Sequence, residues 1–134
     1  MKNKTKILIV EDESIVALDM KNTLTNFGYE VTNCVTNYND AVNSVQTDKP
    51  ELILMDIQMP IMNGYEATKI IRDIDKNIPI ISFTANISDE DIVYSEILGM
   101  NDYLTKPINV EKKLKNYKAF FYHAVKMALH ARCY

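Results

Sequence analysis

Short apolar runs that alternate with segments of helical periodicity constrain the fold of this chain more than any other feature. The runs are residues 6–10 (KILIV), 29–35 (YEVTNCV), 51–56 (ELILMD) and 78–84 (IPIISFT), and 102–106 (DYLTK) is a fifth, weaker strand. After each run, apolar residues recur at spacings of three and four, as they do along one face of a helix. Strands that each lead into a helix predict a parallel sheet with right-handed crossovers and helices on both faces.

The predicted helices have boundaries that the sequence itself marks. The first ends at Gly28, a residue suited to a helix C-terminus, and its apolar positions are Ile15, Leu18, Leu24 and Phe27. The second is expected over 40–47, and the third begins after Asn63 as its cap. SDED at 88–91 has the form of a capping box before the fourth helix, and a last helix is expected from about residue 109.

Length, charge and cysteine usage limit the classes of protein. A chain of 134 residues has room for one domain with a substantial core. A net charge of −3 offers no basic surface for nucleic acid, and no apolar run approaches the roughly 20 residues that span a bilayer. Cys34 and Cys133 lie far apart without metal-like spacing, which favours a reducing cytoplasm. We therefore expect no direct contact with nucleic acid or membrane.

Polar side chains stand at the predicted carboxyl ends of four strands. These residues are Glu11 and Asp12 after the first strand, Asp56 at the end of the third, Thr84 at the end of the fourth, and Lys106 at the end of the fifth. In an open parallel sheet the ligand site lies beyond this edge, where the strand order reverses. The sequence thus predicts that these groups form one site.

The chemistry of that set points to a cation and a phosphoryl group. Two like charges about 4 Å apart repel by roughly 4 kcal/mol at an effective dielectric constant near 20, so clustered carboxylates need a counter-charge. Oxygen ligands of this kind suit Mg²⁺ better than zinc. Mg²⁺, the Lys106 ammonium and the Thr84 hydroxyl together can neutralise or bond the parts of a phosphoryl group.

The motifs at these strand ends resemble those of a known family. They are similar to the motifs of the receiver domain of bacterial two-component response regulators. The motifs are Glu11-Asp12, LILMD at 52–56 with Asp56, FTA at 83–85 with Thr84, and YLTKP at 103–107 with Lys106. The stretch 56–72 (DIQMPIMNGYEATKIIR) is especially similar to receivers of hybrid sensor kinases and single-domain regulators. The resemblance covers residues 5 to about 118 of a single domain over 1–134. It implies a flavodoxin-like, doubly wound α/β fold with a five-stranded parallel sheet in the order 2-1-3-4-5.

The resemblance also implies a phosphorylation-dependent signalling switch. Asp56 would accept a phosphoryl group from a histidine kinase or a histidine phosphotransfer protein. Glu11, Asp12, Asp56 and the backbone carbonyl of Gln58 would hold Mg²⁺. The amides of Gln58 and Asn86 would flank the path of the water that hydrolyses the acyl phosphate. The protein would catalyse no reaction other than this slow self-dephosphorylation.

The same resemblance implies roles for residues at the ends of the fourth and fifth strands. Lys106 and Thr84 would contact the phosphoryl oxygens, and the Lys106–Pro107 peptide bond would be cis. Thr84 and the aromatic ring of Tyr103 would form the switch that changes the partner-docking surface.

Two alternatives use the same fold or the same nucleophile. A Mg²⁺-dependent aspartyl-phosphate hydrolase of the haloacid dehalogenase type needs a second Asp two residues after the first, where this chain has Gln58. A docking module of receiver fold that is never phosphorylated would have no need of the complete set of motif residues. Dinucleotide binding requires a glycine-rich first turn, and EDES at 11–14 has no glycine.

The C-terminal segment departs from the family pattern. Apolar residues continue at helical spacing through 110–130, which predicts a helix roughly 30 Å long at 1.5 Å per residue. Its far half, in 119–134, would extend past the sheet and expose apolar side chains that need a partner or a second copy. We expect a homodimer, or docking to a downstream protein, through this helix. Sedimentation of the native chain against one cut after Lys118 tests it, because two monomers at tens of micromolar would exclude the dimer.

Overall fold

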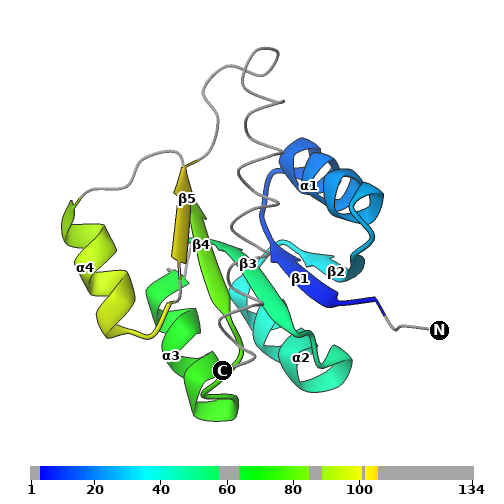
Figure 1. The fold of residues 1–134 in the computed structure, drawn as a ribbon. Coiled ribbons are helices and arrows are strands. Elements are labelled where there is room, and N and C mark those ends of the chain that lie inside the picture. The colour runs from blue at the N-terminus through cyan, green and yellow to red at the C-terminus, as the bar shows by residue number, and fades with distance from the viewer. Residues whose placement is uncertain (1–3, 58–63, 85–88, 101, 106–134) are drawn as a thin grey trace.

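The computed structural model describes residues 4–57, 64–84, 89–100 and 102–105, which form a parallel sheet with helices packed on it (Figure 1). The strand order is β2-β1-β3-β4-β5, and every neighbouring pair is parallel. The strands are β1 (Lys6–Val10), β2 (Glu30–Val35), β3 (Leu52–Asp56), β4 (Ile80–Thr84) and β5 (Asp102–Thr105). This arrangement is the predicted flavodoxin-like α/β fold. The predicted C-terminal helix lies outside the described residues.

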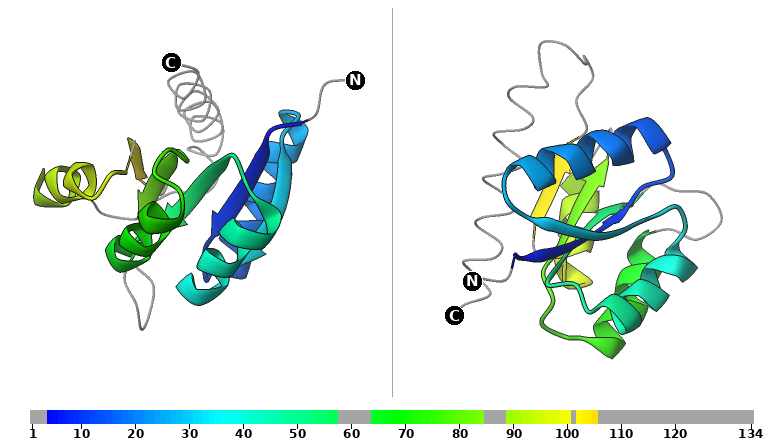
Figure 2. Two further views of the ribbon diagram at one scale, coloured as in Figure 1. Left: turned by 90° about the horizontal axis from the view of Figure 1, so that it is seen from below. Right: turned by 90° about the vertical axis from the view of Figure 1, so that its right-hand side faces the viewer.

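Helices cover both faces of the sheet because successive strand residues point in opposite directions. The helices are α1 (Ser14–Asn26), α2 (Tyr38–Asp48), α3 (Gly64–Ile74) and α4 (Asp89–Ile97). Leu8, Val10, Ile53 and Met55 belong to the core beneath α2 and α3. The alternate residues of β1 and β3 pack with Met20 and Leu24 of α1 on the other face. Figure 2 shows α1 on one side of the sheet and α2 with α3 on the other.

The face that α1 presents to the sheet differs from the predicted one. Of the four predicted core positions only Leu24 is buried, whereas Ile15 is 85% exposed and Leu18 and Phe27 are also exposed. The buried positions are instead Ala17, Met20, Thr23 and Leu24. The spacing of three and four holds for this second set as well, and periodicity alone could not choose between two adjoining apolar faces. Gly28 ends the helix as predicted, with φ of +92°.

Helix α2 begins two residues before its predicted start. The Asn37 side chain accepts a hydrogen bond from the Asp40 backbone N–H at 2.8 Å and donates to the Asp40 carboxylate at 2.9 Å. This reciprocal cap brings Tyr38 into the first turn of the helix and buries its side chain. The predicted caps Asn63 and Ser88 lie outside the described residues.

Candidate metal centre

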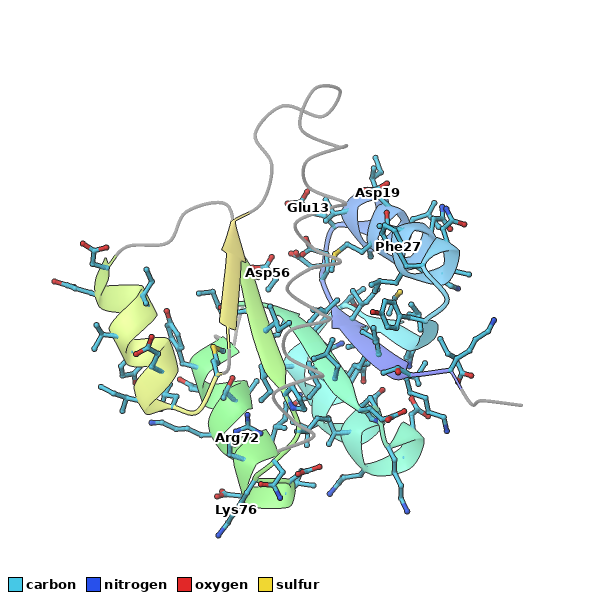
Figure 3. The ribbon with its side chains drawn as sticks, viewed as in Figure 1. Glu13, Asp19, Phe27, Asp56, Arg72 and Lys76 are labelled. Atoms are coloured by element: carbon cyan, nitrogen blue, oxygen red, sulfur yellow. The ribbon has the colours of Figure 1, made fainter. Side chains whose placement is uncertain are left out.

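The predicted carboxylates meet at the carboxyl end of the sheet. Val10 pairs with Met55 in the β1–β3 ladder, so Glu11 and Asp56 each lie one residue beyond a paired position on neighbouring strands. The strand order reverses between β1 and β3, which is where ligands bind in this kind of sheet. Figure 3 shows Asp56 at the same edge as Glu13, at the start of α1. Arg72 and Lys76 lie toward the opposite edge.

The three carboxylates are close enough to act as one group. Carboxylate oxygens of Glu11, Asp12 and Asp56 all lie within 4.8 Å of one another. Glu11 and Asp56 are each only 1% exposed, while Asp12 faces solvent. The Asp12 backbone N–H donates to Oε2 of Glu11 at 3.0 Å. Burial weakens the screening by water, so repulsion within this group is larger than it would be on an open surface.

This donor set fits a hard divalent cation. The group offers carboxylate oxygens and no nitrogen or sulfur ligand, and its exposed member leaves a side open on which bound water can remain. Mg²⁺ is typically held by one or a few carboxylates together with several waters, whereas zinc prefers histidine and cysteine. The cluster therefore fits the predicted Mg²⁺.

Backbone contacts hold the strand ends that carry the carboxylates. The Glu11 N–H donates to the Val35 carbonyl at 3.0 Å, which ties the end of β1 to β2. The Tyr38 phenol donates to the backbone carbonyl of Asp56 at 2.5 Å, inside the core. The side chains of Glu11 and Asp56 thus project from backbone that is hydrogen-bonded to neighbouring elements.

Gly64 permits a close backbone approach to Ile57, the residue that follows Asp56. A Cβ at position 64 would lie 2.7 Å from the Ile57 Cα, a separation that side chains do not tolerate. The Gly64 N–H donates to the Ile57 carbonyl at 3.3 Å. Ile57 and Gly64 are therefore in direct backbone contact, and glycine is required at position 64 for lack of a side chain.

The other predicted site residues are placed only in part. Thr84 is the last residue of β4 and pairs in register with Thr105, and Tyr103 pairs with Ser82 within the β4–β5 ladder. Gln58, Asn86, Lys106 and Pro107 lie outside the described residues. The structure thus brings Glu11, Asp12 and Asp56 together, and leaves the phosphoryl-contacting side chains as predictions.

Two contributors to the site were missing from the sequence analysis. Tyr38 contacts Asp56 through a backbone atom 18 positions away, which no local pattern reveals. Gly64 lies in MNGYE at the start of α3, and a glycine at a helix start was the sequence signal that could have indicated a close backbone contact there.

Arg72 donates hydrogen bonds to backbone carbonyls far from the carboxylate cluster. Its guanidinium donates to the Gly99 carbonyl at 2.6 and 3.1 Å and to the Ile78 carbonyl at 2.7 Å. Burial lowers the pKa of Arg72, an effect that the nearby Asp75 partly offsets. This side chain ties α3 to the turn after α4, at a distance from the metal centre (Figure 3).

Fold and site together define a class: a doubly wound α/β protein with a cluster of carboxylates that fits a cation at the β1–β3 switch point. Residues 7–118 match the family model described as the response regulator receiver domain, and the chain belongs to this family. The expectation drawn from the strand-end motifs is therefore confirmed.

Two relatives align with about three quarters of this chain. It is 36% identical over 102 residues to the chemotaxis protein CheY of Thermotoga maritima, covering 76% of this chain and 85% of that protein. It is 40% identical over 104 residues to the transcription factor SKN7 of Candida albicans, covering 78% of this chain but only 18% of SKN7. The chain thus covers most of the length of CheY and less than a fifth of the length of SKN7.

One similar solved structure contains a magnesium ion. The receiver domain of the sensor histidine kinase PA1611 from Pseudomonas aeruginosa is 31% identical, with a TM-score of 0.79 over 96% of this chain and 99% of that one. That structure has a magnesium ion coordinated in its active site cleft. None of the helices in the described part of the present chain is long and apolar enough to span a bilayer.

Proposed function

We propose that the protein is a phosphorylation-dependent switch of two-component signalling whose phosphoacceptor is Asp56. The observation that carries the proposal is the packing of Asp56, Glu11 and Asp12 within 4.8 Å at the β1–β3 switch point. A carboxylate oxygen of Asp56 attacks the phosphorus of a phosphohistidine, the P–N bond breaks, and an acyl phosphate forms. Glu11, Asp12, Asp56 and the Gln58 carbonyl would hold Mg²⁺, which when bound would offset the negative charge of the phosphoryl group.

The chain's own residues position and protect the reacting carboxylate. Burial of Asp56 at the strand end holds it in one orientation, and it limits the access of water. In this proposal Lys106 and Thr84 bond phosphoryl oxygens, with the Lys106–Pro107 peptide bond in cis. The amides of Gln58 and Asn86 position water without acting as strong bases, so hydrolysis of the acyl phosphate is slow.

Phosphotransfer profiling tests the proposed source of the phosphoryl group. Each histidine kinase of the source organism is first autophosphorylated, and the native protein is then added in the presence of Mg²⁺. We expect rapid transfer from one or a few kinases, or from a histidine phosphotransfer protein, and none to a receiver carrying Asp56→Asn. Absence of transfer from every donor would contradict a role in two-component signalling.

The output is a change of partner affinity over α4 and β5. The bond from Thr84 to the phosphoryl group vacates space into which the Tyr103 ring turns, and this shifts a pre-existing equilibrium. Tyr94 of α4 packs edge-on against Tyr65 of α3, with ring centroids 4.7 Å apart and an interplanar angle of 83°. A displacement of α4 would therefore be transmitted to the helix that follows the phosphoacceptor loop.

Thr84→Ala should separate phosphorylation from the response. The variant keeps the Asp56 nucleophile and the Mg²⁺ ligands, so it should still form the acyl phosphate. Amide chemical shifts in α4 and β5 should change on phosphorylation of the native protein, and should change by less than half as much in the variant. Equal shift changes in both proteins would show that the switch does not pass through Thr84.

Partners follow from the same proposal. The protein would act in the cytoplasm, where Cys34 is kept as a free thiol, and would receive its signal from a kinase or phosphotransfer protein. Its downstream contact would be a protein, or a second copy bound through the helix predicted after residue 109.

A further inference from the structure

Tyr38 is a buried polar side chain that the proposed chemistry does not use. It is the first residue of α2, is 2% exposed, and is among the largest fully buried side chains of the described residues. Its ring packs within the core beneath α2 and α3. A phenylalanine would bury the same ring without having to satisfy a hydroxyl group. The hydroxyl must therefore be explained by what it bonds.

The bond partner is the backbone of the nucleophile itself. The Tyr38 hydroxyl donates to the carbonyl oxygen of Asp56 at 2.5 Å, the short end of the range for O–H···O hydrogen bonds. This carbonyl belongs to the last residue of β3, where the chain leaves the sheet. Fixing the peptide plane that follows Asp56 restrains rotation about the Asp56 backbone, and so restrains the direction in which its carboxylate projects.

The next carbonyl along the chain is held from a different helix. The Gly64 N–H at the start of α3 donates to the Ile57 carbonyl. Two successive carbonyls are therefore bonded, one from α2 and one from α3, and α2 and α3 pack against each other. Ile57 itself is buried. This pair of bonds clamps the backbone at the point where the phosphoacceptor has to be held.

We propose that Tyr38 is a positioning residue, which orients the Asp56 carboxylate for Mg²⁺ binding and phosphoryl acceptance through the hydrogen bond to the Asp56 carbonyl. The inference rests on the proposed function of Asp56 and adds a residue to it. Groups that orient metal ligands without contacting the metal typically change affinity or activity by roughly 10- to 100-fold when removed.

The test compares Tyr38→Phe with a matched control, Thr23→Val. Thr23 is also 2% exposed, and its hydroxyl also donates to a backbone carbonyl, that of Asp19 at 2.8 Å, but on α1 rather than at the site. Each substitution removes one buried hydroxyl and keeps the shape of the side chain. A general loss of stability should therefore affect both variants alike, and a positioning effect should affect only Tyr38→Phe.

Two experiments on the full chain give three quantities. Calorimetry gives the Mg²⁺ dissociation constant, and the rate of phosphorylation against acetyl phosphate concentration at saturating Mg²⁺ gives the maximal rate and the half-saturating donor concentration. For Tyr38→Phe we expect a maximal rate reduced by roughly 10-fold, an unchanged half-saturating donor concentration, and Mg²⁺ binding weakened several-fold. Thr23→Val should stay within about twofold of the native protein in all three quantities.

The outcomes separate this inference from the proposed function. If the native protein is phosphorylated and Tyr38→Phe matches Thr23→Val in both rate and Mg²⁺ affinity, the positioning role is overturned and the function stands. A raised half-saturating concentration at an unchanged maximal rate would assign Tyr38 to donor binding instead, which also overturns it. A native protein that binds Mg²⁺ but is never phosphorylated would overturn the proposed function, and the inferred role in phosphoryl acceptance would fail with it.

Discussion

Asp56→Asn should abolish phosphorylation by acetyl phosphate while leaving the protein folded. The amide is nearly the same size as the carboxylate, so the buried position is still filled, but the neutral group is a poor nucleophile and cannot form an acyl phosphate. We expect the mass of one added phosphoryl group to appear in the native protein and to fall to background in the variant, as measured by intact-protein mass spectrometry.

Asp73→Asn is the matched control for this experiment. Asp73 is an exposed aspartate in α3, outside the carboxylate cluster, and the substitution makes the same change of charge and shape. The control should be phosphorylated at the native rate. Labelling of Asp56→Asn as fast as that of the native protein would show that another residue is the nucleophile.

Asp12→Asn should weaken Mg²⁺ binding by at least about 30-fold. Asp12 faces solvent, so water screens its charge strongly, and a dielectric constant of about 80 sets the lower limit. A unit charge about 4 Å from a divalent cation then contributes about 2 kcal/mol, a factor of about 30 in the dissociation constant. Calorimetric titration of the metal-free protein measures this directly.

Glu13→Gln provides the control, and thermal unfolding provides a second measurement. Glu13 is the next residue along the chain, is exposed, and does not belong to the group of mutually close carboxylates. Its neutralisation should change the Mg²⁺ affinity by less than about threefold. In a chelator, Asp12→Asn should unfold at a temperature no lower than the native protein, because it relieves repulsion among three acids. An unchanged Mg²⁺ affinity in Asp12→Asn would remove this residue from the site.

The parts of the fold and site that could be predicted are those in which local sequence pattern and chemistry agree. The run LILM is buried on both faces of a parallel strand, so Asp56 had to lie where that strand leaves the core. Glu11 and Asp12 follow a similar run in β1, and neighbouring parallel strands carry both sets to one edge. The cluster was therefore predictable from the sequence.

Other features depend on contacts between distant residues. Two apolar faces of α1 have helical spacing, and packing on the sheet selects the one with Ala17 and Met20 over the one with Ile15. Tyr38 acts through the backbone carbonyl of Asp56, which no periodicity or motif spacing reports, and Gly64 is marked in the sequence only by its place at the start of a helix. Their roles depend on the packing of α2 and α3 against the end of β3.

Mapping the phosphorylated residue tests the central claim most directly. The native protein is incubated with acetyl phosphate in Mg²⁺ or in chelator, the acyl phosphate is trapped by borohydride reduction, and the modified residue is located by peptide mass spectrometry. We predict modification at Asp56 in Mg²⁺ and almost none in chelator. Modification at a different residue, or at Asp56 to the same extent without the metal, would contradict the account of a Mg²⁺-dependent phosphoacceptor at the end of β3.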